Sequence, residues 1–150
     1  MKDPYLKPVI LGGMLIVILT IIFAPGIFIW AILGGYLSFN LAKKINKDSI
    51  SLLECFLIGL FTGIIGGISL DLISAISFNS PESQKLLVDI IKTKWPSELP
   101  LPNIKEILPM VYALSSILIL VISIIFSMIG SYVGLIISKK KHNHIKPDQQ

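Results

Sequence analysis

The sequence has 150 residues with a formal net charge of +4 at pH 7, and 53% of its residues are hydrophobic. Charged residues make up 15%, well below the roughly 25% usual for soluble domains, and the mean hydropathy is +0.81. A soluble fold of this length could not bury so much apolar surface, so we expect one all-α integral membrane domain over residues 1–150. The single cysteine excludes an internal disulfide framework and a cysteine-based zinc cluster, and we expect no cofactor.

The first apolar run covers residues 9–42. As one helix it would be about 50 Å long, compared with a hydrocarbon core of about 30 Å. Its middle contains the sequence APG at 24–26, where proline disfavours a continuing helix and glycine permits a reversal. We therefore predict a tight hairpin of two short spans, at about 8–23 and 27–43, with a single kinked helix as the alternative.

Two longer spans follow the hairpin. The third is predicted at about 52–77, and Ser51 with Glu54 three residues later is typical of a capping box at its start. The fourth is predicted at about 107–138, and it is longer than the hydrocarbon core requires. We expect this last helix to be tilted or to project from the bilayer.

The loop between the last two spans, residues 78–106, is predicted to carry a helix of its own. Ser80 followed by Pro81 is typical of a helix start, and leucine and isoleucine recur at helical spacing over residues 86–91. The pattern predicts a short amphipathic helix. It lies either in the membrane interface, anchored by Trp95, or against the outer ends of the bundle.

The lysines set the expected orientation. With four spans and a cytoplasmic N-terminus, nine lysines are cytoplasmic: Lys2, Lys7, Lys43, Lys44, Lys47, Lys139, Lys140, Lys141 and Lys146. The outer loop keeps four lysines and four acidic residues, so its charges balance. We expect a multi-pass protein of the cytoplasmic (inner) membrane with both termini in the cytoplasm. A three-span arrangement would place the first two lysines outside.

The cytoplasmic tail, residues 139–150, begins with Lys139, Lys140 and Lys141. We expect these three lysines to contact anionic lipid, at about 1 kcal/mol per lysine near the surface.

A short pattern occurs twice. The sequence GGY at 34–36 is followed by paired lysines at 43–44, and GSY at 130–132 is followed at the same spacing by lysines at 139–140. A duplication would make the chain two parallel hairpin repeats. The general composition of cytoplasmic helix ends explains the match as well, because small residues, tyrosine and lysine are common there.

Glycines recur at four-residue spacing on two of the predicted spans. Gly59, Gly63 and Gly67 form one stripe, and Gly130 and Gly134 form another. Such stripes let helix backbones approach closely in lipid, so we expect packing surfaces, with a pore lining as the alternative. A Gly63→Leu substitution is expected to disrupt assembly.

Asp71 continues the first stripe by one helical turn from Gly67. An ionisable residue within a span marks a functional hypothesis, here the coordination of a proton or cation. The structural alternative is that Asp71 lies near enough to the outer end of its helix to reach water or to cap a neighbour.

The sequence contains no nucleotide-binding loop, zincin helix or nucleophile elbow, and both histidines, His142 and His144, lie in the tail. We expect a non-enzymatic helix-packing or accessory component of the membrane, with no nucleic acid partner. Its expected partners are the lipid bilayer and either a second copy or another membrane protein. The alternative function is a homo-oligomeric channel or transporter that uses Asp71 and the glycine-lined face.

Three segments carry a family resemblance: AILGGYL at 31–37, ISLLECFLIGLFTGIIGG at 50–67 and IIFSMIGSYVGLIISKKK at 124–141. The chain resembles a family of small, glycine-rich prokaryotic membrane proteins with four spans and no known activity. The resemblance implies an acidic residue at the position of Glu54, often flanked by glycines, and in many members a cysteine cluster between the first two spans. Here Leu53 and Cys55 flank Glu54 and that cluster is missing, so the resemblance implies no metal or redox role.

Overall fold

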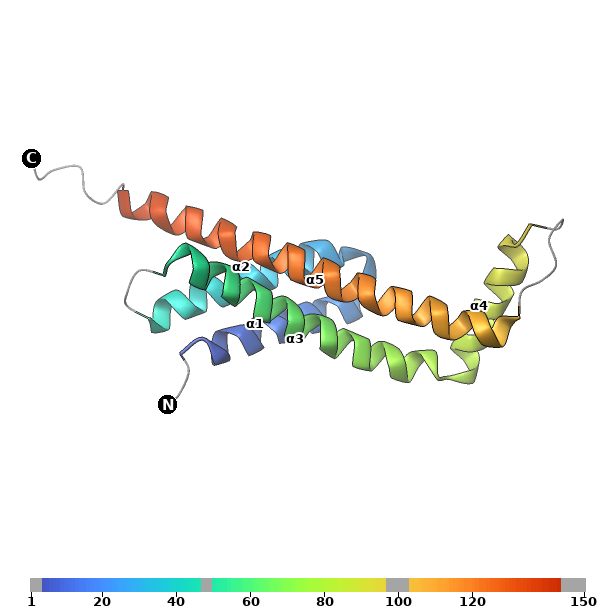
Figure 1. Cartoon of the computed structure of the whole chain (residues 1–150). Helices are drawn as coiled ribbons and strands as arrows, with labels where there is room; N and C mark the ends of the chain where they lie inside the picture. The colour runs from blue at the N-terminus through green and yellow to red at the C-terminus, as the bar shows by residue number, and fades with distance from the viewer. Residues whose placement is uncertain (1–3, 47–49, 97–102, 144–150) are drawn as a thin grey trace, which may run out of the picture.

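The computed structural model describes residues 4–46, 50–96 and 103–143. Over these residues the chain is helical: α1 (Leu6–Ile22), the 3-10 turn η1 (Ala24–Gly26), α2 (Ile27–Ile45), α3 (Leu52–Phe78), α4 (Pro81–Lys94) and α5 (Ile104–Asn143) (Figure 1). The tail beyond residue 143 and part of the expected outer loop, residues 97–102, lie outside the described residues.

The chain is an all-helical membrane protein. Three of its helical segments are long and apolar enough to cross a bilayer: Ala24–Ile45, Leu52–Phe78 and Glu106–Lys140. The remaining apolar helix, α1, has 17 residues and is about 26 Å long, a little less than a hydrocarbon core of about 30 Å. The coarse prediction of an all-α membrane protein is therefore confirmed, whereas four complete spans stay a prediction.

The APG break divides the first apolar run into two helices. The backbone N–H of Gly26 donates to the carbonyl of Phe23 at 3.1 Å, and the indole N–H of Trp30 donates to the same carbonyl at 2.9 Å. Beyond this turn α1 and α2 pack side by side, so closely that a Cβ on Gly12 would lie 2.5 Å from the carbonyl oxygen of Gly34. The run is thus a helical hairpin and not one kinked helix.

Side-chain caps begin the next two helices, as the sequence predicts. Ser51 and Glu54 form a complete capping box, in which Ser51 N–H donates to Glu54 Oε2 at 2.7 Å. At α4, the hydroxyl of Ser80 accepts from the N–H of Ser83 at 3.2 Å and Pro81 takes the first helical position. Each cap satisfies a backbone N–H that the helix cannot satisfy internally.

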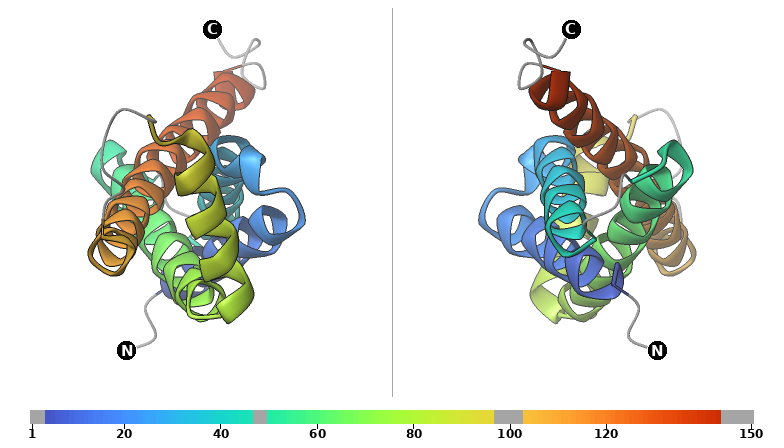
Figure 2. Two further views of the ribbon diagram at one scale, coloured as in Figure 1. Left: turned by 90° about the vertical axis from the view of Figure 1, so that its right-hand side faces the viewer. Right: turned by 90° about the vertical axis from the view of Figure 1, so that its left-hand side faces the viewer.

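The hairpin covers only part of α3 and α5. We call the end of the molecule with Lys43 and Lys140 the lysine end, and the opposite end, which α4 crosses, the α4 end (Figures 1 and 2). The rings of Phe28, in the first turn of α2, and Phe126 of α5 lie 5.1 Å apart edge to face. The hairpin tip therefore lies beside the middle of α5.

The same level is marked on α3 by Leu70, which belongs to the buried cluster at the hairpin tip with Ile16 and Ala31. Beyond Leu70, α3 continues for eight residues to Phe78, or about 12 Å. At the α4 end, the pair formed by α3 and α5 thus extends past the hairpin, and among the described residues α4 lies across it (Figure 1).

Candidate functional site

The glycine stripe of α3 lies against the backbone of α5. A Cβ placed on Gly59 would lie 2.6 Å from the Cα of Met128, and one on Gly63 would lie 2.5 Å from the Cα of Ile124. At Gly67 the nearest atom is the Cδ1 of Leu120, at 2.9 Å. At Gly59 and Gly63 the backbone of α5 leaves no room for a side chain, so the two helices approach to a distance that only glycine permits there, whereas at Gly67 the Leu120 side chain could shift.

The glycines of α5 face α2. A Cβ on Gly130 would lie 2.0 Å from the carbonyl oxygen of Ile32, and one on Gly134 would lie 2.7 Å from the ring of Phe39. The hydroxyl of Ser131 donates to the carbonyl of Gly35 at 3.0 Å across the same contact. The two copies of the repeated sequence pattern therefore meet where α2 and α5 pack, although the duplication itself stays a prediction.

A buried chain of hydroxyl groups, which we did not predict from the sequence, joins α1, α2 and α3. The hydroxyl of Thr62 in α3 lies 2.8 Å from Ser38 Oγ in α2, and Ser38 donates to the carbonyl of Pro8 in α1 at 3.0 Å. Thr62 has one hydroxyl proton, which it can donate either to Ser38 Oγ or to the carbonyl oxygen of Ile58, at 2.7 Å. The available signal was the glycines at 12 and 34, which let these helices come close enough for short hydroxyl side chains to meet.

For Glu54 the sequence predicts a capping role with Ser51. The structure adds a hydrogen-bonded chain from the Glu54 carboxylate to Tyr5 and Asn46. Tyr5 OH donates to Glu54 Oε1 at 2.9 Å, and Asn46 Nδ2 donates to Tyr5 OH at 2.6 Å. These residues lie at the start of α1, the end of α2 and the first turn of α3. The capping carboxylate therefore also ties three helices together at the lysine end.

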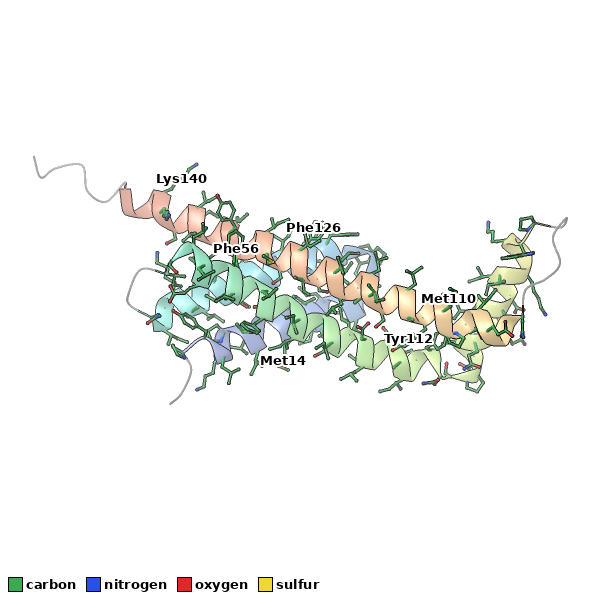
Figure 3. The ribbon with its side chains drawn as sticks, in the orientation of Figure 1. Met14, Phe56, Met110, Tyr112, Phe126 and Lys140 are labelled. Atoms are coloured by element: carbon green, nitrogen blue, oxygen red, sulfur yellow. The ribbon has the colours of Figure 1, made fainter. Side chains whose placement is uncertain are left out.

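The lysines proposed to contact lipid lie on the last turns of α5, which continues through Lys139, Lys140 and Lys141 to Asn143. The side chains of Lys139 and Lys140 are exposed (Figure 3 labels Lys140). The basic segment thus begins as a helix and not as an irregular tail. Nearby, the ammonium of Lys43 donates to the hydroxyl of Ser138, which joins α2 to α5.

Asp71 lies at the α4 end, beside a pocket of about 320 Å³ between α3, α4 and α5. The polar side chains that line it are Asp71, Ser74 and Ser77 of α3, Ser83 of α4, and Tyr112, Ser115 and Ser116 of α5. Apolar atoms complete the wall from Ile73, Phe78, Leu87, Val111 and Ile119. Seven polar side chains from three helices thus line one pocket. From the sequence, Asp71 was the only one of them that we identified as a candidate site residue.

The carboxylate of Asp71 is not fully satisfied by hydrogen bonds. Its Oδ1 is buried and has no hydrogen-bond partner among the described residues, although the side chain as a whole is half-buried. Tyr112 holds the neighbouring backbone, because its hydroxyl donates to the main-chain carbonyl of Asp71 at 3.2 Å (Figure 3 labels Tyr112). A buried carboxylate oxygen without a donor is costly, and a positive charge in the adjoining pocket would offset part of that cost.

The described residues give little support for a metal ion bound by several side chains. Over the described residues, no group of three or more histidine, cysteine, aspartate or glutamate side chains is placed to hold a metal ion. Asp71 is the one acidic residue among the described residues that line the pocket. The arrangement can accept hydrogen bonds and balance one positive charge.

Comparison of the chain with protein-family models, with curated proteins and with solved structures finds no match.

Proposed function

We propose that this chain is a non-enzymatic membrane component that binds a positively charged group through Asp71 at its α4 end. The observation that carries the proposal is the half-buried carboxylate of Asp71 in the mostly apolar wall of a pocket to which six hydroxyl side chains also contribute. A carboxylate inside a membrane span costs about 2.5–3.5 kcal/mol at the helix centre and less towards the interface, so a partner that balances the charge of Asp71 would stabilise the fold. A bound cation supplies that compensation.

The proposed topology has four membrane-embedded helices, α1, α2, α3 and α5, with both termini in the cytoplasm. It is supported by the lysines that gather at one end: Lys43 and Lys44 end α2, and Lys139 and Lys140 lie near the end of α5. The pocket of Asp71 then opens on the outer side of the cytoplasmic membrane. In this topology α4 lies in the outer interface, where its exposed Leu86 and Ile90 contact lipid.

A homo-oligomeric channel is the second candidate, and Asp71 is the feature that favours it. The glycine face of α3 gives it little support, because Gly59 and Gly63 already contact α5 of the same chain. A pore between copies would have to be lined by other residues. An accessory component with a binding pocket therefore agrees better with the packing.

The test is a cation-dependent change in thermal stability of the full chain in a non-ionic detergent. A set of salts at matched ionic strength, including sodium, potassium and methylammonium chloride, would be compared. A ligand at 100 times its Kd stabilises the folded state by about 2.7 kcal/mol, which raises the Tm of a chain of this size by about 5 °C or more. We expect at least one cation to do so in a saturable manner.

Asp71→Asn is expected to abolish that increase and to leave the Tm without ligand unchanged or higher, since it removes a buried charge. The matched control is Asp89→Asn, because Asp89 is an exposed acid on α4 that does not line the pocket. A cation effect that persists in Asp71→Asn, or that is lost equally in Asp89→Asn, would rule out binding at Asp71.

Cross-linking mass spectrometry in the native membrane separates the accessory and channel functions. Lys85, Lys92 and Lys94 on α4 are exposed and can react with an amine-specific cross-linker. Reproducible links from these lysines to a different membrane protein are expected for an accessory component. Links only between copies of the chain would favour the channel.

A further inference from the structure

Two aromatic rings line the pocket together with Asp71. Phe78 ends α3 and Tyr112 lies in the first half of α5, and their ring centroids are 4.9 Å apart with an interplanar angle of 36°. Both side chains are half-buried. The bond from the Tyr112 hydroxyl to the main-chain carbonyl of Asp71 ties this ring pair to the turn of α3 that carries the carboxylate.

A carboxylate beside aromatic rings has a specific binding chemistry. The carboxylate balances a positive charge, and the negative faces of aromatic rings attract the same charge when it is spread over an alkylated ammonium group. Phenylalanine contributes to this attraction without offering a hydrogen bond or an oxygen ligand. The combination therefore distinguishes an organic ammonium from a bare metal ion.

The size of the pocket and its oxygen atoms point to the same class of ligand. Calcium takes six to eight oxygen ligands, usually with several carboxylates, whereas Asp71 is the one acid among the described lining residues. A volume of about 320 Å³ lies at the lower end of the range for small-molecule sites and is far larger than an ion needs. The serine hydroxyls can bond to polar substituents on the ligand.

We infer that the pocket binds an organic ammonium group, with Asp71 as the counter-charge and Phe78 and Tyr112 as the aromatic wall. This inference rests on the proposed function and names its ligand class. The same ammonium chemistry occurs in a free alkylamine and in the headgroup of a phospholipid, and the pocket at the α4 end is open to either source.

The experiment uses the purified full chain in a maltoside detergent, and isothermal titration calorimetry with tetramethylammonium chloride against sodium chloride at matched ionic strength. Saturable binding of tetramethylammonium but not of sodium is expected. Asp71→Asn is expected to abolish it. Phe78→Leu is expected to weaken it about tenfold, the loss expected for one partly desolvated ring, while Phe78→Tyr keeps the affinity within about twofold.

Each result has a defined meaning. Sodium binding that depends on Asp71, without tetramethylammonium binding, would overturn the ammonium inference and leave the proposed cation site standing. Tetramethylammonium binding that Phe78→Leu leaves unchanged would also overturn it. If no cation binds to the wild-type chain, the inference and the proposed function both fail.

A second set of titrations identifies the source of the ammonium. Ethanolamine and a short-chain phosphatidylethanolamine below its micelle concentration would be compared, with short-chain phosphatidylglycerol as the lipid control. Tighter binding of the phosphatidylethanolamine indicates a lipid headgroup, and equal binding of ethanolamine indicates a free amine. Failure of both, with tetramethylammonium also unbound, counts against the inference.

Discussion

Neighbouring glycines of α3 differ in what a side chain would meet. At Gly63 the three nearest atoms to an added Cβ belong to the backbone of α5, with the closest at 2.5 Å. At Gly66, three residues along, the nearest atoms belong to the side chain of Ile16, from 3.1 Å outward. Backbone atoms of a packed helix cannot yield locally, whereas a side chain can change its rotamer or shift slightly.

Alanine at these two positions is therefore expected to have unequal effects. Gly63→Ala should lower stability by about 1–3 kcal/mol, because it overpacks a contact between two backbones. Gly66→Ala should cost clearly less, and the gain in helix propensity can offset its cost. Thermal unfolding of both variants in the same detergent checks this, and equal Tm values would contradict it. Gly63→Leu should prevent correct packing altogether.

The contacts of some residues can be predicted from the sequence more readily than those of others. The spacing of Gly59, Gly63 and Gly67 shows which side of one helix is small, and such a pattern is local. The contact between Ser38 and Thr62 depends instead on the depth and rotation of α1, α2 and α3 relative to one another. Those quantities are set by tertiary packing, so the glycines at 12 and 34 could indicate close packing but not the hydroxyl chain itself.

The binding pocket shows the same limit. Asp71 stood out because a charge within an apolar run is visible in the sequence. Phe78 and Tyr112 gave no such signal, because aromatic residues near span ends are common for reasons of interfacial anchoring. Only the pairing of α3 with α5 brings the two rings together in the pocket that Asp71 also lines.

The helical elements differ in length in a way that matters for the membrane. The hairpin helices α1 and α2 have 17 and 19 residues and are about 26 and 29 Å long, whereas α3 with 27 residues is about 40 Å long. No charged residue occurs between Lys7 and Lys43. The hairpin tip is also apolar and exposed, since Ile22 retains 75% of its accessible surface and Phe23 retains 56%.

Such a tip is expected to stay within the hydrocarbon and not to reach water. The bond from the Trp30 indole to the Phe23 carbonyl supports this, because it satisfies the indole N–H and the second acceptor site of a carbonyl that already accepts from Gly26 N–H. A cysteine in place of Phe23 should therefore resist a membrane-impermeant maleimide in intact vesicles and react only after detergent is added. The native Cys55 is buried and should stay unreactive.

The matched control for the tip is Glu82→Cys, because Glu82 is exposed in the first turn of α4. It should react with reagent added to the outer side. If the Phe23→Cys variant reacts as fast as this control, then the tip lies in the outer aqueous phase and the hairpin crosses the membrane completely. The APG break predicted the hairpin itself, but only the position of the tip beside Phe126 shows how far it extends.

In the whole molecule, the two ends are held together to different degrees. At the lysine end, the hairpin packs on α3 and α5, and the bonds among Tyr5, Glu54 and Asn46 join three helices. At the α4 end, the hairpin is absent, and among the described residues α3 and α5 are accompanied by α4, which has no fully buried residue. Local stability follows the number of buried contacts, so the α4 end should open more readily.

Amide hydrogen exchange of the full chain in detergent is expected to show this gradient within a single helix. Backbone amides of α5 over residues 123–138 pack against α2 and α3 and should exchange slowly, whereas those over residues 107–118 should exchange faster.

A cation that binds at Asp71 links α3 to α5 at the α4 end. It should therefore slow exchange over residues 107–118 and in α4, and leave residues 123–138 unchanged. Uniform exchange along α5, or a ligand effect confined to the lysine end, would contradict this division of the molecule. The pocket thus lies in the less stable part of the fold, where a ligand has the most stability to add.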